Sequence, residues 1–73
     1  MDDDIDLEID ALGLLCPLPV LRLRKRMADL PGGARIRLLA DDPAAFVDVP
    51  HFCAEAGHTF EGAEGHVFTL RKG

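Results

Sequence analysis

The spacing of apolar residues along this 73-residue chain switches between two periods. Apolar and acidic residues alternate over residues 5–10, and a period of two is typical of a half-exposed strand. Apolar residues then recur at helical spacing from about Pro17 to Leu30, until Pro31-Gly32-Gly33 ends the pattern. Residues 34–40 again alternate. The first half of the chain therefore predicts a strand, a helix and a second strand.

A second helical region begins with a repeated sequence pattern. Asp42-Pro43 and Asp48-Val49-Pro50 both place an aspartate, a good helix cap, before a proline that suits the first helical turn. We therefore expect a short turn near residues 43–47 and the main second helix from about 49 to 56. Gly57 is expected to close it.

The remaining segments complete a small α/β fold. Residues 58–62 and 66–71 predict a final strand pair joined at Glu64-Gly65, so the element order is β-α-β-α-β-β. Two helices bury their apolar stripes only by covering a sheet, which favours a two-layer α/β sandwich. We expect a mixed four-stranded sheet with both helices on one face and residues 34–40 in its middle. The length suits one domain, residues 1–73.

The charges of the chain are unevenly distributed around a net charge of −5. Acidic residues dominate the start, which we interpret as a solvated lead-in: Asp2, Asp3, Asp4, Asp6, Glu8 and Asp10. Basic residues gather in the first helix: Arg22, Arg24, Lys25 and Arg26. The acidic start does not resemble a secretory signal, and no apolar run approaches membrane-spanning length. We therefore expect a cytoplasmic protein with no membrane contact and reduced cysteines.

Cys16 is followed by two prolines within three residues. With Cys16 as helix cap, Pro17 becomes the first helical residue and Pro19 the third, where neither needs its missing N–H. The N–H of Leu18 and the helix dipole are then expected to face the sulfur and to favour its thiolate. This predicts an exposed nucleophile. The alternative is that Cys16 is a small buried apolar residue.

The neighbours of Cys16 exclude some kinds of chemistry. A dithiol oxidoreductase needs a second cysteine where Pro19 stands, and no hydrolase signature surrounds Cys16. A thiolate that accepts a group and hands it on, as a persulfide does with sulfane sulfur, fits best. The three histidines, His51, His58 and His66, show no metal-ligand spacing with the cysteines, so we expect no metal and no bound cofactor. Cys53 is expected to pack in the core of the second helix.

Further segments form a pattern more specific than CPxP alone. They are residues 12–19 (LGLLCPLP), Arg24-Lys25, residues 40–44 (ADDPA), residues 48–53 (DVPHFC) and residues 71–73 (RKG). On this pattern, nearly free of gaps over about residues 9–60, the chain resembles the TusA (SirA-like) family of small sulfur-carrier proteins. The resemblance implies the same sandwich fold.

The resemblance also implies a sulfurtransferase-type role as a stoichiometric carrier. Cys16 would take sulfur as a persulfide from a PLP-dependent cysteine desulfurase and pass it to another relay protein. The best-known end point is 2-thiouridine formation in tRNA, while similar proteins serve sulfur oxidation or molybdenum-cofactor assembly.

Individual positions carry over from the family in the same way. Pro17 and Pro19 would shape the site, and Arg24, Lys25 and Asp42 match positions at or near the partner surface. Leu18 belongs to that surface too, although Leu15 and Leu18 stand where relatives can have polar or charged residues.

A different class of function stays open at this point. The basic helix face would suit a small regulatory or RNA-interacting module in which Cys16 is structural, although the net charge of −5 favours the carrier and no direct nucleic-acid contact. Arg24 lies within the apolar arc of its helix, either to cover its stem with apolar neighbours or to meet a partner. Asp42 and Asp48 are expected to act as helix caps. A monomer is expected, since no second apolar face remains after the core is assigned.

Overall fold

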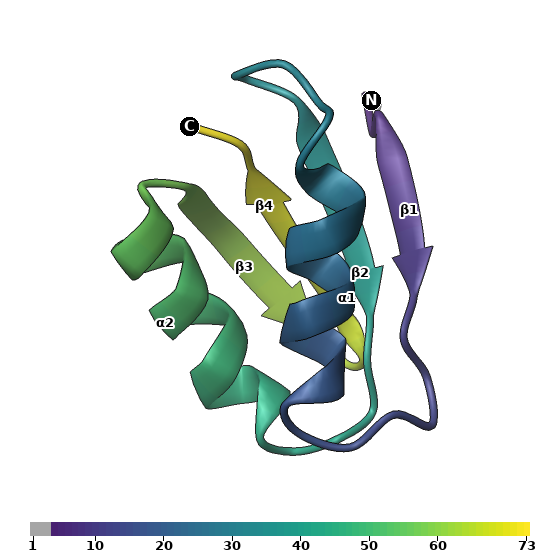
Figure 1. Ribbon diagram of the computed structural model, residues 1–73. Helices are drawn as coiled ribbons and strands as arrows, with labels where there is room; N and C mark the ends of the chain where they lie inside the picture. Colours follow the sequence, from purple (N-terminus) through teal and green to yellow (C-terminus); the bar gives the residue numbers. More distant parts are fainter. Residues whose placement is uncertain (1–3) are drawn as a thin grey trace.

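The computed structural model describes residues 4–73, and the elements follow the predicted order. They are β1 (Leu7–Asp10), α1 (Leu18–Met27), β2 (Arg35–Leu39), α2 (Ala45–Ala56), β3 (Thr59–Glu64) and β4 (Val67–Arg71). The four strands form one sheet. Both helices cover the same face of it, as Figure 1 shows. The predicted two-layer α/β sandwich is confirmed.

The sheet is mixed, with strand order β1-β2-β4-β3. β1 pairs with β2 in parallel, whereas β4 pairs antiparallel with both β2 and β3. β2 therefore lies inside the sheet, as its fading alternation predicts. Because β1 and β2 are parallel, the loops that leave their carboxyl ends lie at the same edge of the sheet.

The core lies between the sheet and the two helices. Alternate strand residues such as Ile36 and Leu38 face the helices and are fully buried, while Arg35 and Arg37 on the same strand face the other side. The helices contribute Leu23 and Met27 from α1 and Val49, Phe52 and Cys53 from α2. This apolar contact surface is the main source of stability in a domain of this size.

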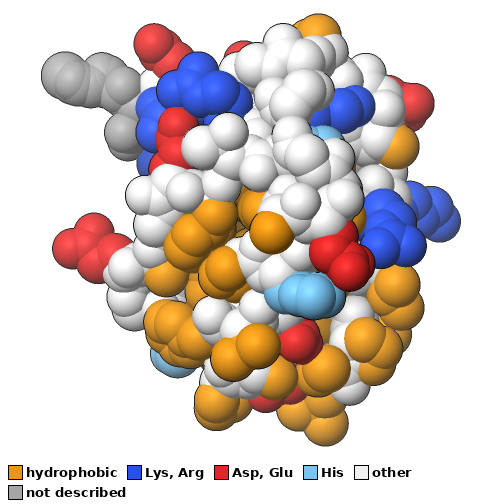
Figure 2. Space-filling view, turned by 90° about the vertical axis from the view of Figure 1, so that its left-hand side faces the viewer, with side chains coloured by type: hydrophobic (Ala, Val, Ile, Leu, Met, Phe, Trp, Pro, Cys, Tyr) orange, Lys and Arg blue, Asp and Glu red, His pale blue; other side chains and the backbone are white. Residues whose placement is uncertain are grey.

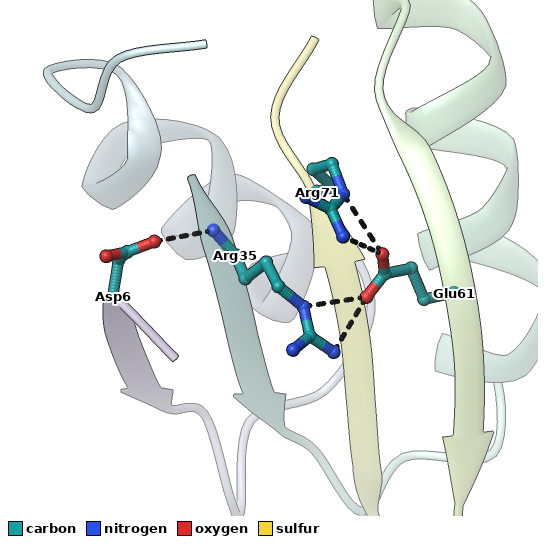
Figure 3. A network of polar contacts seen from close by, with 4 residues as sticks. All are labelled: Asp6, Arg35, Glu61 and Arg71. Carbon is teal, nitrogen blue, oxygen red and sulfur yellow. Dashed lines mark hydrogen bonds and ion pairs between the residues drawn. The ribbon is translucent and has the colours of Figure 1, made fainter. Parts of the chain in front are cut away.

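The opposite sheet face carries a network of charges, drawn in Figure 3. Glu61 on β3 accepts hydrogen bonds from Arg35 and Arg71 at 3.0–3.1 Å. Partial burial acts to raise the pKa of Glu61, but the hydrogen bonds and charges of the two arginines outweigh it and hold the pKa below its ordinary value. This face is therefore polar and solvated, and within residues 4–73 both helices lie on the opposite face.

The acidic N-terminal segment is partly built into the fold. Asp2 and Asp3 lie outside the described residues. Asp6 accepts the N–H of Arg35 at 2.9 Å, and Glu8 pairs with Arg37 at 3.3 Å. These exposed acids are thus solvated, as expected, but they also attach β1 to β2.

α1 begins at Leu18 and ends at Met27. It is therefore shorter than the predicted helix, which runs from about Pro17 to Leu30. The chain beyond it continues as a turn whose carbonyl groups have a specific partner. The Lys72 ammonium donates to the carbonyl oxygens of Met27, Ala28 and Leu30 at 2.6–3.0 Å. A cation at this position satisfies the unpaired carbonyl groups of a helix C-terminus.

The predicted split of the second helical region is wrong. α2 is one helix from Ala45 to Ala56 that contains Pro50 in its interior, and its cap residue is Ala44 rather than Asp48. A continuous helix places Ala45, Val49, Phe52 and Cys53 on one buried face. The burial of this stripe offsets the hydrogen bond that Pro50 cannot donate.

Among the described residues there is no helix that is both long enough and apolar enough to cross a membrane.

Candidate functional site

Cys16 lies at the end of the molecule where the loops after β1 and β2 meet. Figure 1 shows both loops at the bottom of the view, below the start of α1. Two carboxylates from the second loop hold the first. Asp41 accepts the N–H of Gly13 at 3.0 Å, and Asp42 accepts the N–H of Cys16 at 2.6 Å. The same Asp42 carboxylate accepts the N–H of Ala44 at 3.0 Å, so it joins Cys16 to the start of α2.

The two prolines stiffen the start of α1, but not in the predicted positions. Pro17 rather than Cys16 is the cap residue, and Pro19 is buried in the first turn. The peptide bond between Cys16 and Pro17 is cis. The N–H of Leu18 donates to the carbonyl of Leu15 at 2.8 Å, because the loop closes a turn there. The expectation that this N–H faces the sulfur is therefore wrong.

The sulfur of Cys16 is exposed, as expected, but its surroundings favour the thiol. The pKa of Cys16 lies above its ordinary value, mainly because of its interaction with the Asp48 carboxylate. Loss of water around the sulfur and the negative charges of Asp48 and Asp42 act in the same direction. The predicted bias toward thiolate is thus wrong, since the nearby carboxylates act against it.

Large apolar side chains surround this end of the molecule, and we call them the apolar rim. They are between 47% and 71% exposed and comprise Leu12, Leu15, Leu18, Leu21, Phe46 and Val47. Figure 2 shows apolar side chains gathered over the lower end, with acidic atoms between them. The expectation that no apolar face remains is wrong, because the loop after β1 and the first turns of both helices contribute side chains that the core does not use.

The basic residues of α1 divide between two environments. Lys25 lines a shallow groove of about 220 Å³ together with Leu14, Leu18, Leu21 and Arg22. The Arg24 guanidinium lies over the Phe52 ring instead, 5.4 Å from its centre. The structure therefore brings Leu18 and Lys25 to one groove and directs Arg24 toward α2. The contact of Arg24 favours the interpretation that it covers apolar neighbours.

Cys53 is 1% exposed and packs in the core, as predicted. Burial raises the pKa of its thiol. The two cysteines thus occupy opposite environments, one on the surface and one inside. Within residues 4–73, no group of three or more His, Cys, Asp and Glu side chains is arranged to hold a metal ion.

Asp41 and Asp48 were not expected among the residues around the sulfur. Asp42 was expected there only from the family resemblance, as part of a partner surface. In sequence, Asp42 and Asp48 read as helix caps because each precedes a proline. No local signal shows that Asp42 reaches the backbone of a cysteine 26 residues earlier. The only indication that these residues lie near Cys16 is that the loops after β1 and β2 meet at one end of the sheet. That meeting follows from the parallel pairing of β1 and β2.

Comparison with known proteins identifies close similarities. The profile of the family described as "Sulfurtransferase TusA" matches residues 7–72. The "Sulfur carrier protein TusA" of Pseudomonas syringae pv. syringae (strain B728a) is 44% identical over 54 residues, which are 74% of this chain and 64% of that protein. The protein of the same description from Pseudomonas syringae pv. tomato (strain ATCC BAA-871 / DC3000) is 39% identical over 66 residues, 88% of this chain and 79% of the relative.

The match therefore spans less than two thirds of the first relative's length. A solved structure shows the same arrangement of elements. The SirA-like protein from Desulfitobacterium hafniense superposes with a TM-score of 0.73 at 28% identity, covering 92% of this chain and 97% of that one.

Proposed function

Because this chain belongs to the TusA family of sulfur carriers, we propose that it receives sulfane sulfur as a persulfide on Cys16 and passes that sulfur to an acceptor protein. The observation that carries the proposal is that Cys16 is exposed whereas the other thiol, Cys53, is buried. The backbone N–H of Cys16 donates to Asp42, which fixes the loop that carries the sulfur. A carrier needs one accessible sulfur and no neighbouring thiol that would resolve its persulfide into a disulfide.

The transfer is a displacement at sulfur. The Cys16 sulfur, as thiolate, attacks the terminal sulfur of a donor persulfide, and the S–S bond of the donor breaks. The donor cysteine leaves as a thiolate and takes up the proton that Cys16 lost, so Cys16 becomes the persulfide with no net oxidation. In the second step an acceptor thiolate attacks the terminal sulfur on Cys16 in the same way. The carrier works stoichiometrically and needs no cofactor of its own.

The partners follow from this chemistry. We propose a PLP-dependent cysteine desulfurase as donor, a sulfur-relay protein as acceptor, 2-thiouridine formation in tRNA as the end point and the cytoplasm as the location. Pro17 and Pro19 limit the movement of the backbone next to the sulfur. Partners would dock on the apolar rim, with Leu18, Lys25 and Asp42 at the contact and Arg24 at its edge.

Sulfur loading tests the proposal directly. The full chain is incubated with a PLP-dependent cysteine desulfurase and cysteine, and its intact mass is measured. Wild type and Cys53→Ala are expected to gain the mass of one sulfur atom, removable by a thiol reductant, whereas Cys16→Ser gains none. Alanine is the better control at position 53, because a buried serine hydroxyl would lack a partner.

Failure of sulfur loading would favour the alternative function. If wild type gains no sulfur from the desulfurase or from thiosulfate, the persulfide proposal is wrong. Salt-dependent binding of RNA, lost on charge reversal at Arg22, Lys25 and Arg26, would then support the regulatory or RNA-interacting module.

A further inference from the structure

We propose that Asp42 positions the Cys16 sulfur for transfer, because its two carboxylate oxygens join the backbone of Cys16 to the start of α2. This role rests on the proposed function and deepens it, since it assigns a positioning residue to that reaction. From the family resemblance, Asp42 was expected at or near a partner surface. The hydrogen bonds of its side chain are instead made inside the molecule, with two backbone N–H groups.

The segment that carries the sulfur has few backbone donors. Among residues 16–19, the two prolines have no N–H to donate. The N–H of Leu18 donates to the carbonyl of Leu15 at 2.8 Å, within the same loop. The N–H of Cys16 instead reaches a distant part of the chain, where Asp42 accepts it at 2.6 Å. A change at Asp42 therefore acts directly on the residue that bears the sulfur.

Asp42 is itself held by the start of α2. One carboxylate oxygen accepts the N–H of Ala44 at 3.0 Å, while the other accepts that of Cys16. The backbone carbonyl of Asp42 accepts the N–H of Ala45, a buried core residue, at 2.9 Å. The hydrogen bonds from Ala44 and then Cys16 outweigh the loss of water and hold the pKa of Asp42 below its ordinary value. The ionised carboxylate thus keeps both oxygens as acceptors at neutral pH.

Transfer between two docked proteins depends on the orientation of the sulfur. The Cys16 thiolate attacks the terminal sulfur of the donor persulfide, a new S–S bond forms as that of the donor breaks, and the donor cysteine leaves as a thiolate. A donor docked on the apolar rim presents its persulfide from one direction, so the rate depends on where the Cys16 sulfur points. A small alkylating reagent reaches the exposed sulfur from many directions. Positioning by Asp42 therefore predicts that its loss slows loading but not alkylation.

Asp42→Asn separates the two contacts of the carboxylate. An amide has one acceptor oxygen, and its NH2 group only donates, so asparagine accepts one N–H in place of two. Asparagine also forms the local turn to a backbone N–H two residues on, which keeps the contact with Ala44. The N–H of Cys16 then loses its acceptor. Within residues 4–73, Asp41 accepts only the N–H of Gly13, so Asp41→Asn removes a neighbouring charge and keeps its contact.

The amide proton of Cys16 in NMR spectra reports on this contact without any sulfur donor. A short hydrogen bond to a carboxylate is charge-assisted and moves the signal of the amide proton downfield. We expect the Cys16 signal to move well upfield in Asp42→Asn and to stay close to wild type in Asp41→Asn. An unchanged Cys16 signal in Asp42→Asn would show that the contact is absent in solution and would overturn the proposal.

The rate of sulfur loading tests the positioning role, with the Cys53→Ala chain as parent. Intact mass is followed at increasing concentrations of a PLP-dependent cysteine desulfurase with cysteine. We expect the maximal rate to fall by about tenfold in Asp42→Asn, because a displaced reacting atom slows transfer even in a docked complex. Alkylation by iodoacetamide should be no slower than in the parent, since removal of a negative charge does not disfavour the thiolate. Asp29→Asn, on an exposed residue after α1, should change neither rate.

A second variant guards against loss of the fold. Asp42→Ser keeps a local acceptor for the helix start but is too short to reach Cys16, so it should show the same loss of maximal rate. Thermal unfolding followed by circular dichroism sets an assay temperature at which the variants are folded.

The maximal rate separates positioning from docking. A contribution of Asp42 to docking raises the donor concentration needed for the half-maximal rate. If the maximal rate of Asp42→Asn equals that of the parent, or if loading and alkylation fall by the same factor, Asp42 does not position the sulfur and the proposal is overturned. If the parent itself gains no sulfur, the proposed function is wrong and the positioning role is wrong with it.

Discussion

Cys16 and Cys53 illustrate how surroundings decide what a side chain does. Both are free cysteines, and both have a pKa above the ordinary value. For Cys53 the cause is burial alone, whereas for the exposed Cys16 the main cause is the nearby Asp48 carboxylate. The same direction of shift therefore has different causes in the two cysteines.

A prediction at the residue scale concerns His58. Its Nδ1 accepts the N–H of Gly73 at 3.0 Å, and desolvation, with the charge of Lys72, lowers the pKa of His58. The folded state thus prefers neutral imidazole. This contribution to stability is present above the ordinary pKa of about 6.5 and is lost as pH falls through the lower folded value. We expect the unfolding temperature to fall between pH 7 and pH 5, with a smaller fall in His58→Asn.

His66→Asn is the matched control, because His66 is exposed in the turn between β3 and β4. In His66→Asn the unfolding temperature, measured by circular dichroism, should fall with pH as steeply as in wild type. If the unfolding temperature falls equally with pH in wild type and in His58→Asn, protonation of His58 does not contribute to the pH dependence of stability.

At the scale of elements, α2 shows a conflict between local preference and packing. Each Asp-x-Pro or Asp-Pro step favours a helix start, yet the helix runs through Pro50. The apolar stripe of α2 needs the full length from Ala45 to Cys53 to cover the sheet. Asp48 consequently lies inside the first turn of α2 and does not cap the helix.

We predict that Pro50→Ala stabilises the protein. Alanine restores a helical N–H and removes a ring from the helix interior, and the gain exceeds the entropy that proline takes from the unfolded chain. The free energy of unfolding in urea should rise by up to about 2 kcal/mol. Pro43→Ala, outside the helix, should lower it by about 0.5 kcal/mol. Losses of similar size in both variants would show that Pro50 is unstrained in α2.

At the scale of the whole molecule, the two faces of the sheet and the loop end have separate roles. The helix-covered face of the sheet supplies the core. The open face carries the ion pairs of Glu61 with Arg35 and Arg71. The loop end exposes the apolar rim around Cys16. A protein of this size rarely leaves such apolar surface at one end without a binding role, which favours docking there.

We predict that a polar substitution in the apolar rim lowers sulfur loading without lowering the stability of the fold. Leu21→Gln should change the free energy of unfolding by no more than about 0.5 kcal/mol, because Leu21 is already 47% exposed. Sulfur loading by the desulfurase at limiting donor concentration should fall severalfold, since an apolar docking contact is lost. Ala54→Gln, on the exposed part of α2, should affect neither quantity. Undiminished loading in Leu21→Gln would place the docking surface elsewhere.

The sequence alone was sufficient for the order of elements, the covered sheet face and the core role of Cys53. Periods of two and 3.6 are local properties of the backbone, so they are readable without knowing which segments meet. Element boundaries were less accurate, as at α1 and α2, because the Lys72 contact and the packing of Pro50 come from outside the local pattern.

Only the tertiary structure decided the surroundings of the sulfur. Parallel pairing of β1 and β2 brings the loop of Asp41 and Asp42 against a loop 26 to 28 residues earlier in the chain. Asp48, near the start of α2, then acts to raise the pKa of Cys16. The sequence predicted Cys16 as the reactive residue. The pKa of its thiol depends on carboxylates that are distant in sequence, and these come near Cys16 only once the sheet has formed.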